Sequence, residues 1–122
     1  MFRVEIQQPD SLLRIQYSEH VGPGEVKACL EMLRTQLNDM QPGFRLLTDL
    51  SQLESMDPAC APYIGEIMDL LRDRGLELVV RVIPDSHKDI GLNILSFFHY
   101  GSDVRAETYE NLEQAMQSLS AP

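Results

Sequence analysis

The sequence predicts a single α/β domain with a mixed five-stranded sheet and four helices. Two segments near the start alternate apolar and polar residues, as half-buried strands do. Residues 44–84 then read as apolar strand, polar turn, amphipathic helix and second apolar strand. This order is typical of a right-handed crossover between parallel strands. The length of 122 residues fits one domain, which we expect to span 1–122.

The first half of the chain predicts a hairpin, a helix and a strand. Alternation over 2–6 and 13–17, with a turn at 8–10 between them, indicates two antiparallel strands. Apolar residues at helical spacing over 26–40 predict the first helix, which Pro42 and Gly43 end. The third strand is expected from about Arg45 to Leu50.

The second half completes the order β-β-α-β-α-β-α-β-α. A second helix should start near Ala61 and end at Gly75. Residues 76–83 hold the longest apolar run, which favours a strand covered on both faces. A third helix is expected over 86–100, where Ser86 and Asp89 form a capping pair. A short edge strand over 103–107 and a last helix capped by Thr108 follow.

Charge and composition exclude several classes of function. The net charge is −9 and the pI is about 4.6, so the surface repels phosphate backbones and nucleic acid is not an expected partner. No apolar run approaches the roughly 18 residues of a membrane span, and the first residues do not resemble a signal peptide. We therefore expect a cytoplasmic protein with free thiols at Cys29 and Cys60.

The turn at 51–60 carries most of the reactive groups. They are two hydroxyls, two carboxylates and a thiol: Ser51, Glu54, Ser55, Asp57 and Cys60. One interpretation is a recognition surface at the carboxyl end of a strand, where partners bind in open α/β sheets. The other is that Asp57 caps a helix whose first residue is Pro58, a preferred arrangement.

The sequence lacks a set of residues for catalysis or for a cofactor. It has neither a glycine-rich phosphate loop nor a nucleophile elbow. Residues 85–89 offer too few ligands for zinc and fit a helix cap, so no metal is expected. Cys60 could act as a nucleophile only if His87 approached it in space. Packing of Cys60 against the sheet is the simpler interpretation, and we expect no enzyme.

The third predicted helix is apolar nearly all round over 92–100. Such a helix is either deeply buried or offers one side to a partner. It would then cover an apolar ligand pocket or contact another protein. The pocket would be lined by Ile90, Ile94, Phe97 and Phe98.

Short motifs around the turn resemble the STAS domain of anti-sigma factor antagonists and of the cytoplasmic tails of sulfate transporters. The matching pieces are 49–51, Asp-Leu-Ser, and 56–57, Met-Asp, before a helix and an apolar strand. The chain is also similar to the STAS/SEC14-like small bacterial proteins. In regulatory STAS members the residue after the loop aspartate is a serine that a kinase phosphorylates. Here that residue is Pro58, so the resemblance implies a domain without this switch.

The leading hypothesis is a non-enzymatic, regulatory module that binds a protein. The partner-binding residues would be Ser51, Ser55, Met56, Asp57, Pro58, Cys60 and His87. The alternative is a carrier or sensor of a small, lipid-like apolar ligand under the third helix. Homodimerisation through the edge of the first strand or through the third helix stays open.

Overall fold

The computed structural model describes residues 1–7, 10–84, 99–101 and 103–120. Its five strands are β1 (Phe2–Gln7), β2 (Leu12–Val21), β3 (Arg45–Met56), β4 (Leu78–Val82) and β5 (Arg105–Tyr109). Its α-helices are α1 (Pro23–Gln36), α2 (Ala61–Asp73) and α4 (Leu112–Ser120). Two short 3-10 turns, Leu37–Asp39 and Pro58–Cys60, follow α1 and precede α2.

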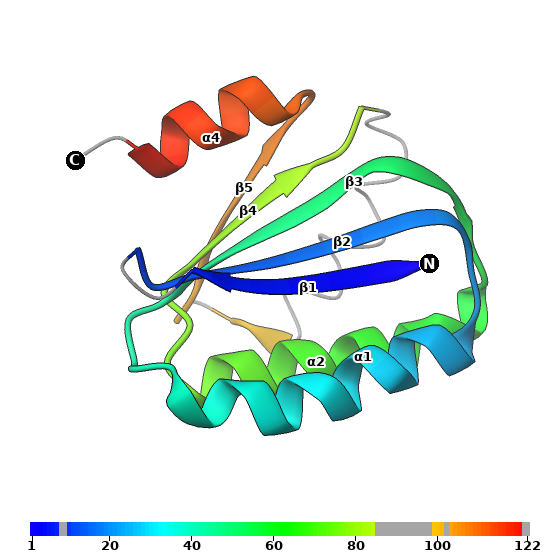
Figure 1. The fold of residues 1–122 in the computed structure, drawn as a ribbon, viewed down its shortest axis with the longest axis horizontal. Coiled ribbons are helices and arrows are strands. Elements are labelled where there is room, and N and C mark those ends of the chain that lie inside the picture. The colour runs from blue at the N-terminus through cyan, green and yellow to red at the C-terminus, as the bar shows by residue number, and fades with distance from the viewer. Residues whose placement is uncertain (8–9, 85–98, 102, 121–122) are drawn as a thin grey trace.

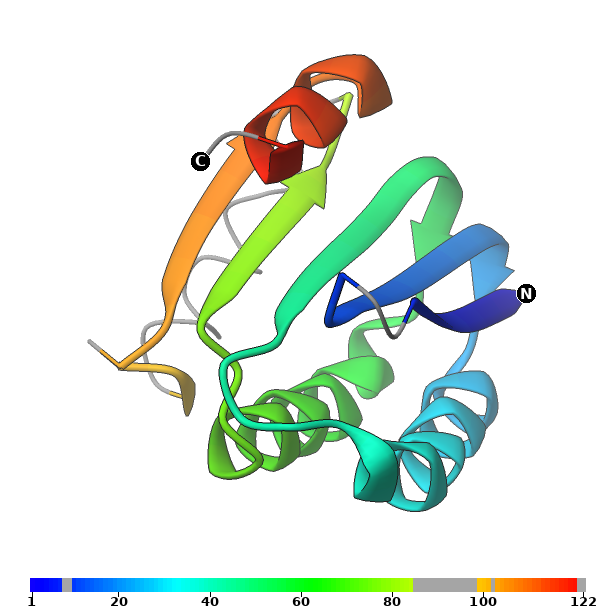
Figure 2. The ribbon, with the colours of Figure 1, turned by 60° about the vertical axis from the view of Figure 1, so that its left-hand side comes forward.

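The five strands form one mixed sheet in the order β1-β2-β3-β4-β5. β1 pairs antiparallel with β2, whereas the remaining neighbours are parallel. Helices α1 and α2 cover one face of the sheet, and α4 covers the other face over β4 and β5 (Figures 1 and 2). The predicted α/β class and the mixed five-stranded sheet are therefore confirmed.

The described residues contain three α-helices instead of the four predicted. The remaining prediction, a helix over 86–100, falls almost entirely on 85–98, which lie outside the described residues. No helix in the described part of the chain is both long and apolar enough to cross a membrane.

The predicted end of the third strand at Leu50 is wrong, because β3 continues to Met56. β3 leaves β4 after the Asp49–Val82 pair but stays paired with β2 as far as Val21–Met56. The β2–β3 register shifts at two places along this extension. Such irregularities insert extra residues into one strand and break the two-residue alternation by which a strand is recognised.

Two apolar clusters hold the layers together. The larger lies between the sheet and helices α1 and α2, and it includes Phe44, Leu33 and Leu71, none of which is exposed. The smaller lies under α4 and includes Val80 and Ala115. Within β4, Val79 belongs to the larger cluster and Val80 to the smaller. The prediction that this strand is covered on both faces is therefore confirmed.

Candidate functional site

The corner between β3 and α2 is shaped by a capped 3-10 turn. Asp57 has an extended backbone, and its Oδ1 accepts a hydrogen bond from the Ala59 amide at 2.9 Å. Pro58 is the first residue of the turn, where its missing N–H costs nothing. Helix α2 then begins at Ala61, as predicted, and Pro62 falls in its first turn. The capping interpretation of Asp57 is thus confirmed.

The exposed surface of this corner consists of small apolar residues in the turn and of polar residues at the end of the neighbouring strand. Pro58, Ala59, Ala61 and Pro62 are exposed around the turn. Ser55 is exposed at the end of β3, and its Oγ lies 2.6 Å from Nδ1 of His20 in β2. No local sequence pattern indicates this contact of His20, because only the shifted β2–β3 register brings it opposite Ser55.

Cys60 does not belong to the exposed surface, so its predicted contact with a partner is wrong. Its side chain is 1% exposed, and Sγ donates to the Val21 carbonyl at 3.6 Å. Burial, and to a lesser degree the charge of Asp57, raises the pKa of the Cys60 thiol. A thiol with a raised pKa is a poor nucleophile at neutral pH. Cys60 therefore packs the corner against the sheet.

The other predicted contact residues take different positions. Ser51 is half-buried, and its amide donates to Oδ1 of Asp49 at 3.0 Å. Met56 is half-buried and packs against the larger core. His87 and the four predicted pocket residues, Ile90, Ile94, Phe97 and Phe98, lie outside the described residues. The structure therefore brings Ser55, Met56, Asp57 and Pro58 together at the corner.

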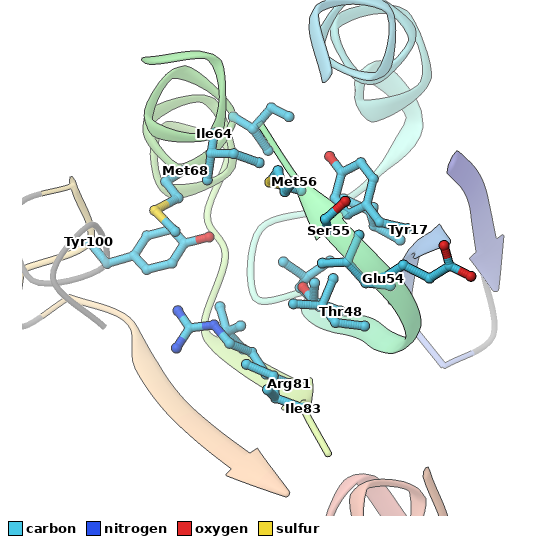
Figure 3. A pocket seen from close by; sticks show the side chains of 16 residues that line it. Tyr17, Thr48, Glu54, Ser55, Met56, Ile64, Met68, Arg81, Ile83 and Tyr100 are labelled. Carbon is cyan, nitrogen blue, oxygen red and sulfur yellow. The ribbon is translucent and has the colours of Figure 1, made fainter. Parts of the chain in front are cut away.

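A cavity of about 380 Å³ opens beside the corner, between the sheet and α2 (Figure 3). Its described lining is mainly apolar and comes from β2, β3, β4 and α2, including Ile15, Leu46, Ile67 and Val79. Ser55 and Met56 line it as well, so the cavity and the corner share residues.

One charged side chain lies deep in this apolar wall. Arg81 of β4 is 2% exposed and lines the cavity on the side of Tyr100 (Figure 3). Burial raises the pKa of the Tyr100 hydroxyl far above its ordinary value, and the positive charge of Arg81 partly opposes this. Sequence reasoning missed Arg81, although a charge inside the longest apolar run was the available signal. Among the described residues, no three metal-ligating side chains cluster.

Comparisons with known proteins identify the fold. No family model and no curated protein matches the sequence. An uncharacterized protein from Shewanella loihica, of the DUF3478 family with a SpoIIAA-like fold, superposes with a TM-score of 0.73. It is 12% identical, over 97% of this chain and 93% of that one.

Two further structures have the same architecture. The phosphorylated form of the Bacillus cell fate determinant SpoIIAA is 13% identical over 98% of this chain and 99% of its own, with a TM-score of 0.63. An anti-sigma factor antagonist from Mycobacterium paratuberculosis is 17% identical over 99% and 96%, with a TM-score of 0.60. The chain therefore has the SpoIIAA-like fold, as its resemblance to STAS domains predicted.

Proposed function

We propose that the protein is a non-enzymatic regulatory module that binds a protein partner through the β3–α2 corner. The observation that carries this proposal is the exposed turn itself. Pro58, Ala59 and Pro62 face outward, while Cys60 anchors the turn in the core. A rigid, exposed apolar turn with a capped backbone loses little conformational entropy on binding. Structures of the same fold carry the name anti-sigma factor antagonist.

In this proposal the contact is not switched by phosphorylation at residue 58. Proline has no hydroxyl to accept a phosphoryl group, and its ring also fixes the first residue of the turn. The corner would act as a constitutive contact. Glu19, Glu54 and Asp57 lie on or beside it, and the chain carries a net charge of −9. The matching partner surface is therefore basic.

The test is affinity capture from the native cytosol with matched surface variants. Ala59→Arg adds a bulky cation to an exposed position of the turn, and Ala28→Arg does so on the exposed side of α1. We expect a captured protein that is retained by the wild type and by Ala28→Arg but lost with Ala59→Arg. Asp57→Ala should weaken capture per folded molecule. Capture that Ala59→Arg leaves unchanged would contradict the proposal.

A second candidate function is the binding of a small apolar ligand, because the cavity lies directly beside the corner. Its volume of about 380 Å³ falls in the range of small-molecule sites, and its lining has the expected few polar groups in an apolar wall. We would measure the melting temperature with a medium-chain fatty acid as the probe. A ligand that binds only the folded state raises this temperature. Val79→Phe should fill the cavity and abolish the shift. No shift in the wild type would argue against a ligand of this class.

A further inference from the structure

The outer edge of β1 is unpaired among the residues that the structure describes. β1 pairs with β2 on one side and stands at the margin of the sheet (Figures 1 and 2). An edge strand presents a row of free N–H and C=O groups, which can pair with another strand. Proteins usually protect such an edge with charged side chains or covering segments.

The hydrogen-bond pattern fixes which residues face outward. Met1 and Ser18 exchange two backbone bonds, at 2.8 and 3.0 Å. Hydrogen-bonded and non-hydrogen-bonded pairs alternate along an antiparallel ladder, and the β1–β2 register is unbroken from Phe2–Tyr17 to Gln7–Leu12. Arg3 and Glu5 therefore bond to β2. The backbone groups of the even-numbered residues, with Val4 at their centre, point to the free edge.

This outward set is complementary to a second copy of itself. If a two-fold axis passes between two Val4 residues, the N–H of each Val4 donates a hydrogen bond to the C=O of the other. Phe2 then lies opposite Ile6, and Arg3 lies opposite Glu5. Opposite charges facing each other across an antiparallel pair are favourable. A parallel pairing in register would instead set arginine against arginine and glutamate against glutamate. The charge pattern thus selects the antiparallel register.

Apolar side chains gather at the same margin. Phe2, Val4 and Ile6 are half-buried against the larger core, on the face that α1 covers. Glu25 of α1 forms an ion pair with the amino group of Met1, which places that side of α1 beneath β1. Met32 lies seven residues further on, on the same side of the helix. Its side chain is 39% exposed, although it is large and apolar.

We propose that two copies of the chain associate through antiparallel pairing of their β1 strands, so that their sheets become one continuous sheet. Arg3 and Glu5 already form an ion pair within one protomer at 2.7 Å, with side chains 72% and 37% exposed. Such exposed pairs contribute little stability. Their role in the dimer is to set the register. A single pair of short strands buries less than a standard interface, so the association is weak and depends on concentration.

This dimer does not rest on the partner-binding proposal, because β1 and the β3–α2 corner use different residues. The test is sedimentation velocity over a range of concentrations with charge variants. Arg3→Glu sets like charges opposite each other at both ends of the strand pair, and Glu5→Arg does the same with the opposite sign. We expect each variant to weaken dimerisation at least tenfold. The double variant Arg3→Glu/Glu5→Arg restores the complementary pattern and should restore the dimer.

A matched control lies at the other edge of the sheet. Arg105 of β5 also forms an ion pair with a glutamate two residues away, and its side chain is 77% exposed. Arg105→Glu should leave dimerisation unchanged. A wild-type chain that stays monomeric at millimolar concentration would overturn the proposal. So would single variants that dimerise like the wild type, or a double variant that fails to recover. Circular dichroism checks that each variant is folded.

Discussion

The two faces of the sheet differ in how they are filled. The face under α1 and α2 carries the larger core and the cavity, which Arg81 lines. The face under α4 carries a smaller cluster that includes Val80 and Ala115, neither of which is exposed. The same strand serves both, because successive residues of β4 point to opposite faces. The space that could hold a small molecule therefore lies on one face, whereas the described residues of the other face pack against a helix.

The largest expected difference between the faces comes from truncating a core leucine on each. Leu71 of α2 is fully buried in the larger core, whereas Leu119 of α4 is 7% exposed near the end of a short helix. Removing a buried leucine side chain costs the burial of its atoms and leaves a cavity. We expect Leu71→Ala to lower the free energy of unfolding by about 4 kcal/mol and Leu119→Ala by about 2 kcal/mol. Urea unfolding followed by circular dichroism measures both, and equal losses would break the comparison.

A second prediction concerns the contacts that hold α2 in place beside the cavity. His99 lies against Gly65, and a Cβ at Gly65 would fall 2.5 Å from Nε2 of His99. Nδ1 of His99 lies 2.8 Å from Oδ1 of Asp69, and Arg72 donates to the His99 carbonyl at 2.6 Å. Gly65→Ala must displace this ring, so we expect a loss of about 1–3 kcal/mol in the free energy of unfolding.

Gly24 in α1 provides the control for that substitution. A Cβ there meets nothing within 4 Å, and alanine favours a helix over glycine by about 1 kcal/mol. Gly24→Ala should therefore stabilise the protein slightly in the same urea experiment. If Gly65→Ala also stabilises it, the contact between His99 and α2 does not constrain the helix.

Val79 and Val80 of β4 give a sharper test with one added methylene each. Val79 lines the cavity, and Val80 packs in the solid cluster under α4. At Val79 the extra group has space to enter, so Val79→Ile should change the free energy of unfolding by less than about 1 kcal/mol. At Val80 it overfills a packed core, and we expect Val80→Ile to cost about 1–3 kcal/mol. If both substitutions cost the same, the cavity beside Val79 is not present in solution.

Local sequence patterns predicted most of the sheet and of the helices. Alternation marked β1 and the start of β2 as far as Tyr17, because buried apolar residues alternate with half-buried polar ones along this part of β2. Gly75 was correctly placed as a stop after α2, since it adopts a φ of +98° that favours glycine. The Asp57 cap was also predictable, because capping depends on residues that are neighbours in sequence. The predicted Thr108 cap is wrong, because Thr108 lies in β5 and the Asn111 side chain accepts from the Gln114 amide at the start of α4.

The features that depend on distant residues could not be predicted in the same way. The extension of β3 to Met56 exists through pairing with the far end of β2, and its irregular register hides the strand pattern. The burial of Cys60 depends on contact with Val21, which is 39 residues earlier. The volume of the cavity depends on how α2 packs on the sheet. No local pattern encodes the spacing between α2 and the sheet, so the sequence predicted the capped turn but not the cavity beside it.

The smallest expected effect concerns the attachment of α4, which Glu107 of β5 stabilises. Its Oε2 accepts hydrogen bonds from Ser118 of α4 at 2.9 Å and from Tyr109 at 3.0 Å, and Arg105 lies 2.9 Å from Oε1. The hydrogen bond from Ser118, and more weakly those from Tyr109 and Arg105, lower the pKa of the Glu107 carboxyl. A carboxyl whose pKa is lower in the folded state stabilises that state above its unfolded pKa, which is about 4.3. This stabilisation is lost as the pH falls through the folded value.

Glu107→Gln should therefore be less stable than the wild type at pH 7, and the difference should shrink as the pH falls below about 4. Urea unfolding of both proteins at pH 7, 5, 4 and 3 measures it. The effect should be smaller than those above, because the side chain is 29% exposed and water screens its charge. Ser118→Ala tests the cause, since it removes the first of the two hydroxyl donors and should reduce the pH dependence. If the difference in the free energy of unfolding stays constant from pH 7 to pH 3, the charge of the Glu107 carboxylate does not help to hold α4 against the sheet.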